Sequence, residues 1–230
     1  MANQAVRLDH KDLATPESRI GQALAFLPYL LILTGFLGGA ALVIDATAGE
    51  RERQSLEPLL ATPAGRGQIM TGKILAACSV GLLGLLLTLL AFKLSFMLAP
   101  SLGIKLSLSW GQVAQLLLVL VPIVLIGTSL LTAIAAGAKS VKEAQSYLSM
   151  LMMLPILPTI ILMVNPMKNQ LWQFAVPFLA QNQMILKIVR SENISAQEWG
   201  VYLLCGFGLG ALLWFIAARR YHNEKLAISA

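Results

Sequence analysis

Long apolar runs, separated by short polar segments, make up most of the sequence. A helix needs roughly 20 residues to cross the hydrocarbon core of a membrane. Five runs reach or approach this length, at about residues 22–44, 70–98, 112–137, 147–165 and 199–218. The pattern predicts an all-α protein: a polytopic transmembrane helix bundle over residues 22–218, with polar tails at 1–21 and 219–230.

The composition agrees with a membrane protein. Of the 230 residues, 57% are hydrophobic and only 12% are charged, and the mean hydropathy is +0.74. Soluble domains carry about 25% charged residues. The first apolar run follows a polar stretch and exceeds the length of a signal-peptide core, so we interpret it as a retained span. Cys78 and Cys205 lie in predicted spans, where free, buried thiols are expected rather than a disulfide or a metal site.

The distribution of lysine and arginine predicts the orientation, because cytoplasmic loops are enriched in these residues. One side of the predicted membrane has the segments 45–69, 138–146 and 219–230 and the start of the second span. The basic residues there are Arg51, Arg53, Arg66, Lys73, Lys139, Lys142, Arg219, Arg220 and Lys225. The opposite loops contain Lys105, Lys168, Lys187 and Arg190. We therefore expect an extracytoplasmic N-terminus and a cytoplasmic C-terminus. This bias also accounts for the formal net charge of +6. No nucleic acid is expected as a partner, since no basic face is interleaved with aromatics.

Prolines and small residues interrupt the predicted spans. Pro28, Pro122, Pro155 and Pro158 lie inside predicted helices, where each removes a backbone donor and can kink the axis. Gly206 and Gly210 form a G-x-x-x-G spacing, which lets two helices approach closely. Such a helix-packing face can serve within one subunit or between subunits, and the spacing does not choose between them.

Ionisable residues are scarce inside the predicted spans. Asp45 lies at the inner end of the first span, and Lys93 lies near the outer end of the second, where its stem can reach the interface. A proton- or sodium-driven carrier normally needs buried acids. We therefore expect the energy for any transport to come from elsewhere.

The external loop at 166–198 is apolar but broken by Pro177 and by the polar run Gln181–Gln183. We interpret it as a short re-entrant or interfacial segment. Trp172 and Phe178 are expected at the level of the lipid headgroups.

The first cytoplasmic loop, 45–69, has the most distinctive pattern. Charges crowd at residues 50–53, and Ser55 can then cap a short helix. In that helix leucines recur at positions i, i+3 and i+4, which gives it one apolar face; they are Leu56, Leu59 and Leu60. An amphipathic helix held between two spans can contact a lipid surface, the bundle or a partner protein, and the spacing leaves all three open.

Residues 67–73 reproduce most of a phosphate-binding loop. Gly67, Gly72 and Lys73 have the required spacing, but Ile74 stands where the pattern needs the serine or threonine that holds magnesium. These residues open a predicted membrane helix rather than follow a buried strand. We expect no nucleotide, metal or other cofactor site in this chain.

Two stretches resemble a known family. GERERQSLEPLLATPAGRGQIMTGK, residues 49–73, resembles the signature loop of ABC type-2 export permeases, in particular the sodium-extrusion permease (NatB-like) branch. AKSVKEAQSYLSMLMMLP, residues 138–155, is similar to a later cytoplasmic turn of the same branch. The resemblance covers roughly residues 20–222.

The resemblance implies the permease subunit of an ATP-driven exporter in a bacterial plasma (inner) membrane. ATP and magnesium would be bound by a partner ABC ATPase subunit, so this chain is not expected to be an enzyme, and a second permease chain would complete a homodimer. Sodium is the cargo that the resemblance suggests; the residues themselves do not select an ion over a lipid, peptide or drug. The short helix in the first loop would be a coupling helix that docks on the ATPase.

The coupling role implied by the family pattern falls on Glu50, Arg51, Glu52, Arg53, Leu56, Glu57, Leu59 and Leu60. The second cytoplasmic motif is matched by Lys142, Glu143, Ala144 and Gln145, to which the chemistry assigns no role.

Permeases of this branch usually begin with an additional membrane helix and a large extracytoplasmic domain, neither of which precedes residue 22 here. We therefore expect a correspondence to the C-terminal membrane portion of such a permease. An ATP-independent channel, a membrane scaffold and a truncated, non-transporting fragment are alternatives. A membrane enzyme is disfavoured: the two histidines, His10 and His222, lie in tails on opposite sides, and no G-x-S-x-G or H-E-x-x-H motif occurs.

Overall fold

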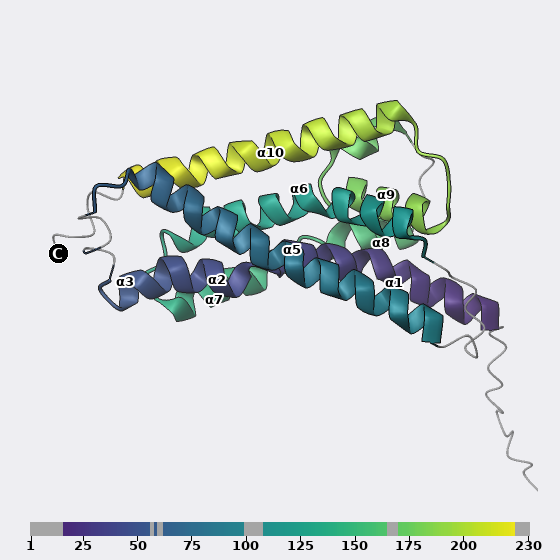
Figure 1. Ribbon diagram of the computed structural model, residues 1–230, viewed down its shortest axis with the longest axis horizontal. Helices are drawn as coiled ribbons and strands as arrows, with labels where there is room; N and C mark the ends of the chain where they lie inside the picture. The colour runs from purple at the N-terminus through teal and green to yellow at the C-terminus, as the bar shows by residue number, and fades with distance from the viewer. Residues whose placement is uncertain (1–15, 56–57, 59–61, 99–107, 165–169, 224–230) are drawn as a thin grey trace, which may run out of the picture.

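The computed structural model describes residues 16–55, 58, 62–98, 108–164 and 170–223 (Figure 1). Within these ranges every regular element is helical, which confirms the all-α prediction. Five helical stretches are long and apolar enough to cross a membrane, as predicted: Phe26–Glu52, Arg66–Ser95, Trp110–Ala135, Val141–Ile161 and Ala196–Arg220.

The first stretch is a nearly continuous rod made of α1 (Pro16–Leu37), α2 (Ala40–Ile44), a π-helical segment (Asp45–Gly49) and α3 (Glu50–Glu52). The rod is interrupted at Gly38 and Gly39, and it ends where Gln54 takes a positive φ of 53°. The predicted loop 45–69 therefore begins as helix. The charges at residues 50–53 lie on and directly after the last turn of the rod rather than in a separate loop.

The rod packs against α5 (Arg66–Leu98) and α6 (Trp110–Ala135) through glycines. A Cβ atom on Gly39 would lie 2.5 Å from the carbonyl oxygen of Ala77 in α5, and one on Gly127 would collide with the main chain of Phe36. Absent side chains let these backbones approach closely. Around this crossing the core is apolar, with Ile32, Leu85 and Ile123 fully buried in one cluster.

The last helix, α10 (Ala196–Asn223), lies along α6 (Figure 1). A Cβ atom on Gly206 would lie 2.9 Å from Cβ of Pro122, and one on Gly210 would lie 2.7 Å from Cδ2 of Leu125. The structure thus places both glycines of the G-x-x-x-G spacing against α6 of the same chain.

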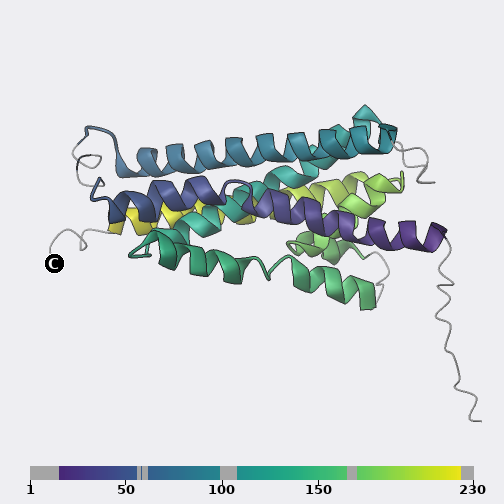
Figure 2. The ribbon, with the colours of Figure 1, turned by 90° about the horizontal axis from the view of Figure 1, so that it is seen from below.

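The fourth stretch is two helices rather than one. It consists of α7 (Val141–Leu151) and α8 (Ile156–Val164), and the turn between them ends at Pro155. The expectation that Pro155 lies inside a continuous helix is wrong, because its ring and missing N–H end the preceding helix. Pro158 lies in the first turn of α8, where proline is tolerated. Figure 2 shows α7 and α8 on one side of the rod and α5 on the other.

The loop before α10 folds into the bundle. It contains a 3₁₀ helix (Leu171–Ala175) and α9 (Leu179–Val189), which packs against α1 and α6. The Phe178 ring meets Phe36 edge to face, with ring centroids 5.2 Å apart, so it packs inward rather than facing outward. Trp172 is 53% exposed. α9 is thus buried among the helices of the bundle.

Candidate functional site

Four helix ends meet at one end of the bundle, which we call the α3 end. Figure 1 shows α3, the start of α5 and the end of α10 at this end. Arg51 of α3 bonds to Ala138 just after α6, and Arg220 of α10 bonds to Ala133 of α6. This end contains the described residues of both motifs that are expected on the cytoplasmic side.

Glu50 faces α5. Its carboxylate forms an ion pair with the ammonium group of Lys73, which also donates to the carbonyl oxygen of Ala46 at 2.6 Å. The side chains of Glu50 and Lys73 are 22% and 12% exposed. In such a partly desolvated place the attraction is stronger than at a surface, but each charge is costly if its partner is removed.

Arg51 and Glu52 face the turn between α6 and α7. The Arg51 guanidinium donates to the carbonyl oxygen of Ala138 at 3.3 Å. The Glu52 carboxylate accepts a hydrogen bond of 2.8 Å from the backbone N–H of Val141, the first residue of α7. Glu52 thus satisfies one of the donors that a helix N-terminus leaves without an internal partner. This bond joins the first cytoplasmic motif to the second across 89 positions of sequence.

Arg53 turns back to its own rod. Its guanidinium donates to the Asp45 carboxylate at 2.9 Å, and both side chains are more than half exposed. The hydrogen bond that Arg53 donates to Asp45, followed by charge attraction between the two groups, raises the pKa of Arg53 above its ordinary value. Such an exposed pair contributes little to stability.

The second motif caps and packs the start of α7. Ser140 accepts from the backbone N–H of Glu143, and the Glu143 carboxylate accepts from the backbone N–H of Lys139 at 2.7 Å and from the Tyr147 hydroxyl at 3.0 Å. Ala144 is fully buried in a cluster with residues of α2 and α6, whereas Lys142 and Gln145 are exposed.

Four expected coupling residues, Leu56, Glu57, Leu59 and Leu60, lie outside the described residues, so the amphipathic helix stays a prediction. The adjacent Ser55 hydroxyl donates to the carbonyl oxygen of Glu50 at 3.2 Å. Residues 67–73 form the first turns of α5. This stretch is helical, whereas the phosphate-binding pattern requires a loop between a strand and a helix.

Sequence reasoning missed the role of Lys73 and of the turn at Ala138–Val141. For Lys73 a signal existed: it is a lysine at the foot of an apolar span, after a loop that contains acids, and such a charge is stable there only when paired. No comparable signal marked the backbone groups of Ala138 and Val141, because every residue has them.

The opposite end contains buried polar groups from α9. Lys187 forms an ion pair of 2.5 Å with Glu198 and lies 5.2 Å from the centroid of the Phe174 ring. The Asn182 amide donates to the Thr159 hydroxyl of α8 at 3.1 Å. Nearby on α5, the Lys93 ammonium donates to the carbonyl oxygen of Leu108 at 2.5 Å. These bonds anchor α9 and the ends of the spans that lie opposite the α3 end.

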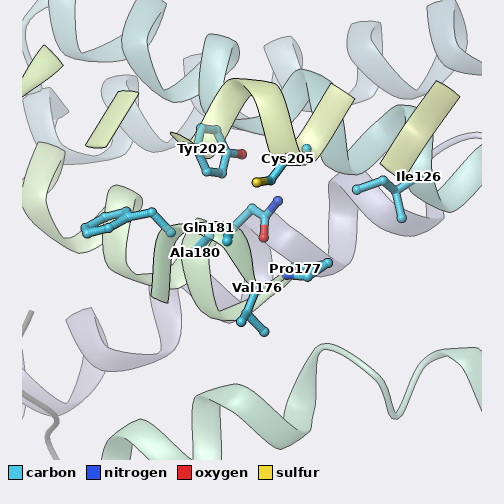
Figure 3. A pocket seen from close by; sticks show the side chains of 10 residues that line it. Ile126, Val176, Pro177, Ala180, Gln181, Tyr202 and Cys205 are labelled. Carbon is cyan, nitrogen blue, oxygen red and sulfur yellow. The ribbon is translucent and has the colours of Figure 1, made fainter. Parts of the chain in front are cut away.

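Two hollows lie near α9. Figure 3 shows Gln181, Tyr202 and Cys205 around a cavity of about 10 Å³, which has room for about one water molecule. An open depression of about 420 Å³ lies between the start of α6 and the end of α9, lined by Ser109, Gly111, Gln112, Gln115, Ile188, Ser191 and Glu192.

The bundle of apolar helices long enough to cross a membrane, with polar contacts between helices at its α3 end, defines a multi-pass membrane protein. The chain matches the family described as ABC-2 family transporter protein over residues 2–222, and it belongs to that family. This confirms the resemblance found in the sequence.

Among curated proteins, the chain is similar to the ABC transporter permease protein NatB of Bacillus subtilis (strain 168). The two are 34% identical over 164 residues, which cover 67% of this chain and 42% of that protein. The match therefore spans less than half the length of this relative. Both comparisons are with membrane components of ABC transporters.

Proposed function

We propose that this chain is the permease subunit of an ATP-driven exporter, in which a separate ATPase subunit binds and hydrolyses ATP with magnesium. One observation carries the proposal: the two motifs that the resemblance places on the cytoplasmic side meet at the α3 end, where Glu52 accepts from Val141 of α7. Four helix ends gathered at one point form a place where movement of a partner can reach several spans at once.

We further propose that the α3 end faces the cytoplasm of a bacterium. The described basic residues at this end are Arg51, Arg53, Arg66, Lys73, Lys139, Lys142, Arg219 and Arg220. Those toward the other end are Arg19, Lys93, Lys187 and Arg190. Basic residues concentrate on the cytoplasmic side of membrane proteins, which supports this orientation. This orientation also places the α3 end on the side of the membrane where an ATPase subunit has access to ATP.

The transporter that we propose contains two copies of this chain and two ATPase subunits. Nucleotide-driven closure of the ATPase subunits would push on the α3 end of each permease and alternate access between the two sides. Lipid covers the apolar outer faces, as the exposed leucines of α5 suggest; they include Leu75, Leu83 and Leu87.

Sodium is the cargo that we propose, on the resemblance to the sodium-extrusion branch. The test is reconstitution of the chain with an ABC ATPase subunit encoded by a neighbouring gene. We expect sodium to stimulate ATP hydrolysis more than potassium does at equal ionic strength. Equal hydrolysis with both ions would contradict sodium as the cargo. Sodium flux without ATP would instead support a channel, and failure of the two proteins to associate would contradict the permease assignment.

A further inference from the structure

Three consecutive side chains at the end of the first rod contact two helices and the turn between α6 and α7. Glu50 pairs with Lys73 of α5, Arg51 donates to Ala138 in that turn, and Glu52 accepts from Val141 of α7. Successive residues of a helix point about 100° apart. A single turn of α3 can therefore reach neighbours on three sides.

These contacts join α3 to other parts of the same chain. The Glu50 side chain is only 22% exposed and pairs with Lys73, and Arg51 donates to the buried Ala138. The Glu52 side chain is exposed, but one of its oxygens accepts from the first amide of α7. Burial disfavours Glu50 as a docking residue, and the bond to α7 gives Glu52 a role within the chain.

The turn that receives two of the contacts is braced. Gly137 and Ala138 donate their amides to Ile134 and Ala135, and Ser140 accepts from Glu143. Ala138 and Ala144 are both fully buried in the cluster that contains Val43 and Ile44 of α2. Because small side chains let α2 and the turn pack closely, displacement of the rod moves the turn with it.

We propose that Glu50, Arg51 and Glu52 form an internal joint, which transmits displacement of α3 to α5, to the turn after α6 and to α7, and that these contacts within the chain, rather than contacts with the ATPase subunit, are their role. They are positioning residues that act through other helices. The inference rests on the proposed function in one respect: the ATPase subunit is the source of the displacement. The contacts that form the joint do not depend on the proposed function. The family resemblance had implied only a shared coupling role for residues 50–60.

The first test needs no transport. In Glu52→Ala the Val141 amide loses its acceptor, whereas in Glu52→Gln a side-chain oxygen can still accept it. We expect hydrogen exchange at the Val141 amide, followed by NMR with isotope-labelled valine, to become about ten-fold faster in Glu52→Ala. Exchange in Glu52→Gln should stay close to wild type. Equal rates in wild type and Glu52→Ala would overturn the joint.

The second test separates transmission from docking in the complex with the ATPase subunit. For Glu52→Ala we expect normal co-purification of the subunit, nearly normal ATP hydrolysis and about ten-fold less radioactive sodium moved per ATP hydrolysed. Glu52→Gln should restore most of that ratio. Lys139→Ala is the matched control, an exposed charge at the same end whose backbone amide is unchanged.

Loss of co-purification in Glu52→Ala, or an unchanged ratio of sodium to ATP, would overturn the inference. If the wild-type chain neither binds the ATPase subunit nor moves sodium, the proposed function fails. The exchange experiment still decides in that case whether Glu52 holds α7.

Discussion

At the scale of single residues, the fold depends on places where a side chain is absent and places where a charge is paired. Gly39 and Gly127 let the rod, α5 and α6 meet backbone to backbone. Lys73 and Glu50 stabilise one another at the edge of the apolar region. Both features act through contacts between segments that are far apart in the sequence.

Gly127→Ala should destabilise the bundle by about 1–3 kcal/mol, because its Cβ atom would collide with the main chain of Phe36 and backbone cannot yield as a flexible side chain can. Thermal unfolding in detergent measures the change. The matched control is Gly84→Ala on α5, where a Cβ atom would meet nothing within 4 Å. Alanine is the better helix former, so this control should not lower stability. Equal effects of the two substitutions would contradict the close approach at Gly127.

Lys73→Met should lower the free energy of unfolding by about 1–3 kcal/mol, because it leaves the partly buried Glu50 carboxylate without its partner. Glu50→Leu in addition should recover part of the loss, since the unpaired charge is then removed. Denaturant unfolding of the two single variants and the double variant gives the coupling, with Lys139→Met as an exposed control. Additive effects would mean that the two side chains do not interact.

At the scale of elements, apolar length predicted the five spans but not their interruptions. The first rod runs on to Glu52 because no proline occurs between Ala40 and Arg53, and length alone does not say where a helix leaves the membrane. The break at Pro155 was predicted only as a kink. Pro177 and the polar run Gln181–Gln183 indicated a re-entrant or interfacial segment in the loop that contains α9, but the burial of α9 depends on partners in α1 and α6 that local sequence does not name.

Pro155→Ala should extend α7 to position 155, because alanine restores a backbone donor and removes the ring that ends α7. Pro158 would then lie inside the helix and would keep a kink there. The new amide at position 155 reports this directly, through slow hydrogen exchange. In Pro28→Ala the new amide lies inside α1, which is helical on both sides, so it provides the positive control. Exchange at position 155 as fast as in an unstructured peptide would show that the break does not depend on the proline.

At the scale of the whole molecule, the two motifs recognised in the sequence occupy one end of the bundle. Their resemblance to a family could be read from the residues alone, and the family match confirms it. The contact between the two motifs could not be predicted from the residues, because Glu52 binds a backbone amide 89 positions away. Any residue at position 141 other than proline would present that amide. The leucine-faced helix at 56–60 and the cargo stay predictions.

The orientation of the α3 end tests the central claim most directly, because an ATPase subunit can act only on the cytoplasmic side. In a background with Cys78 and Cys205 replaced by alanine, Arg53→Cys marks the α3 end and Glu192→Cys marks the opposite end. A thiol reagent that cannot cross membranes should label Glu192→Cys in intact bacteria and Arg53→Cys only after the cells are permeabilised. Labelling of Arg53→Cys in intact cells, with Glu192→Cys protected, would contradict the account.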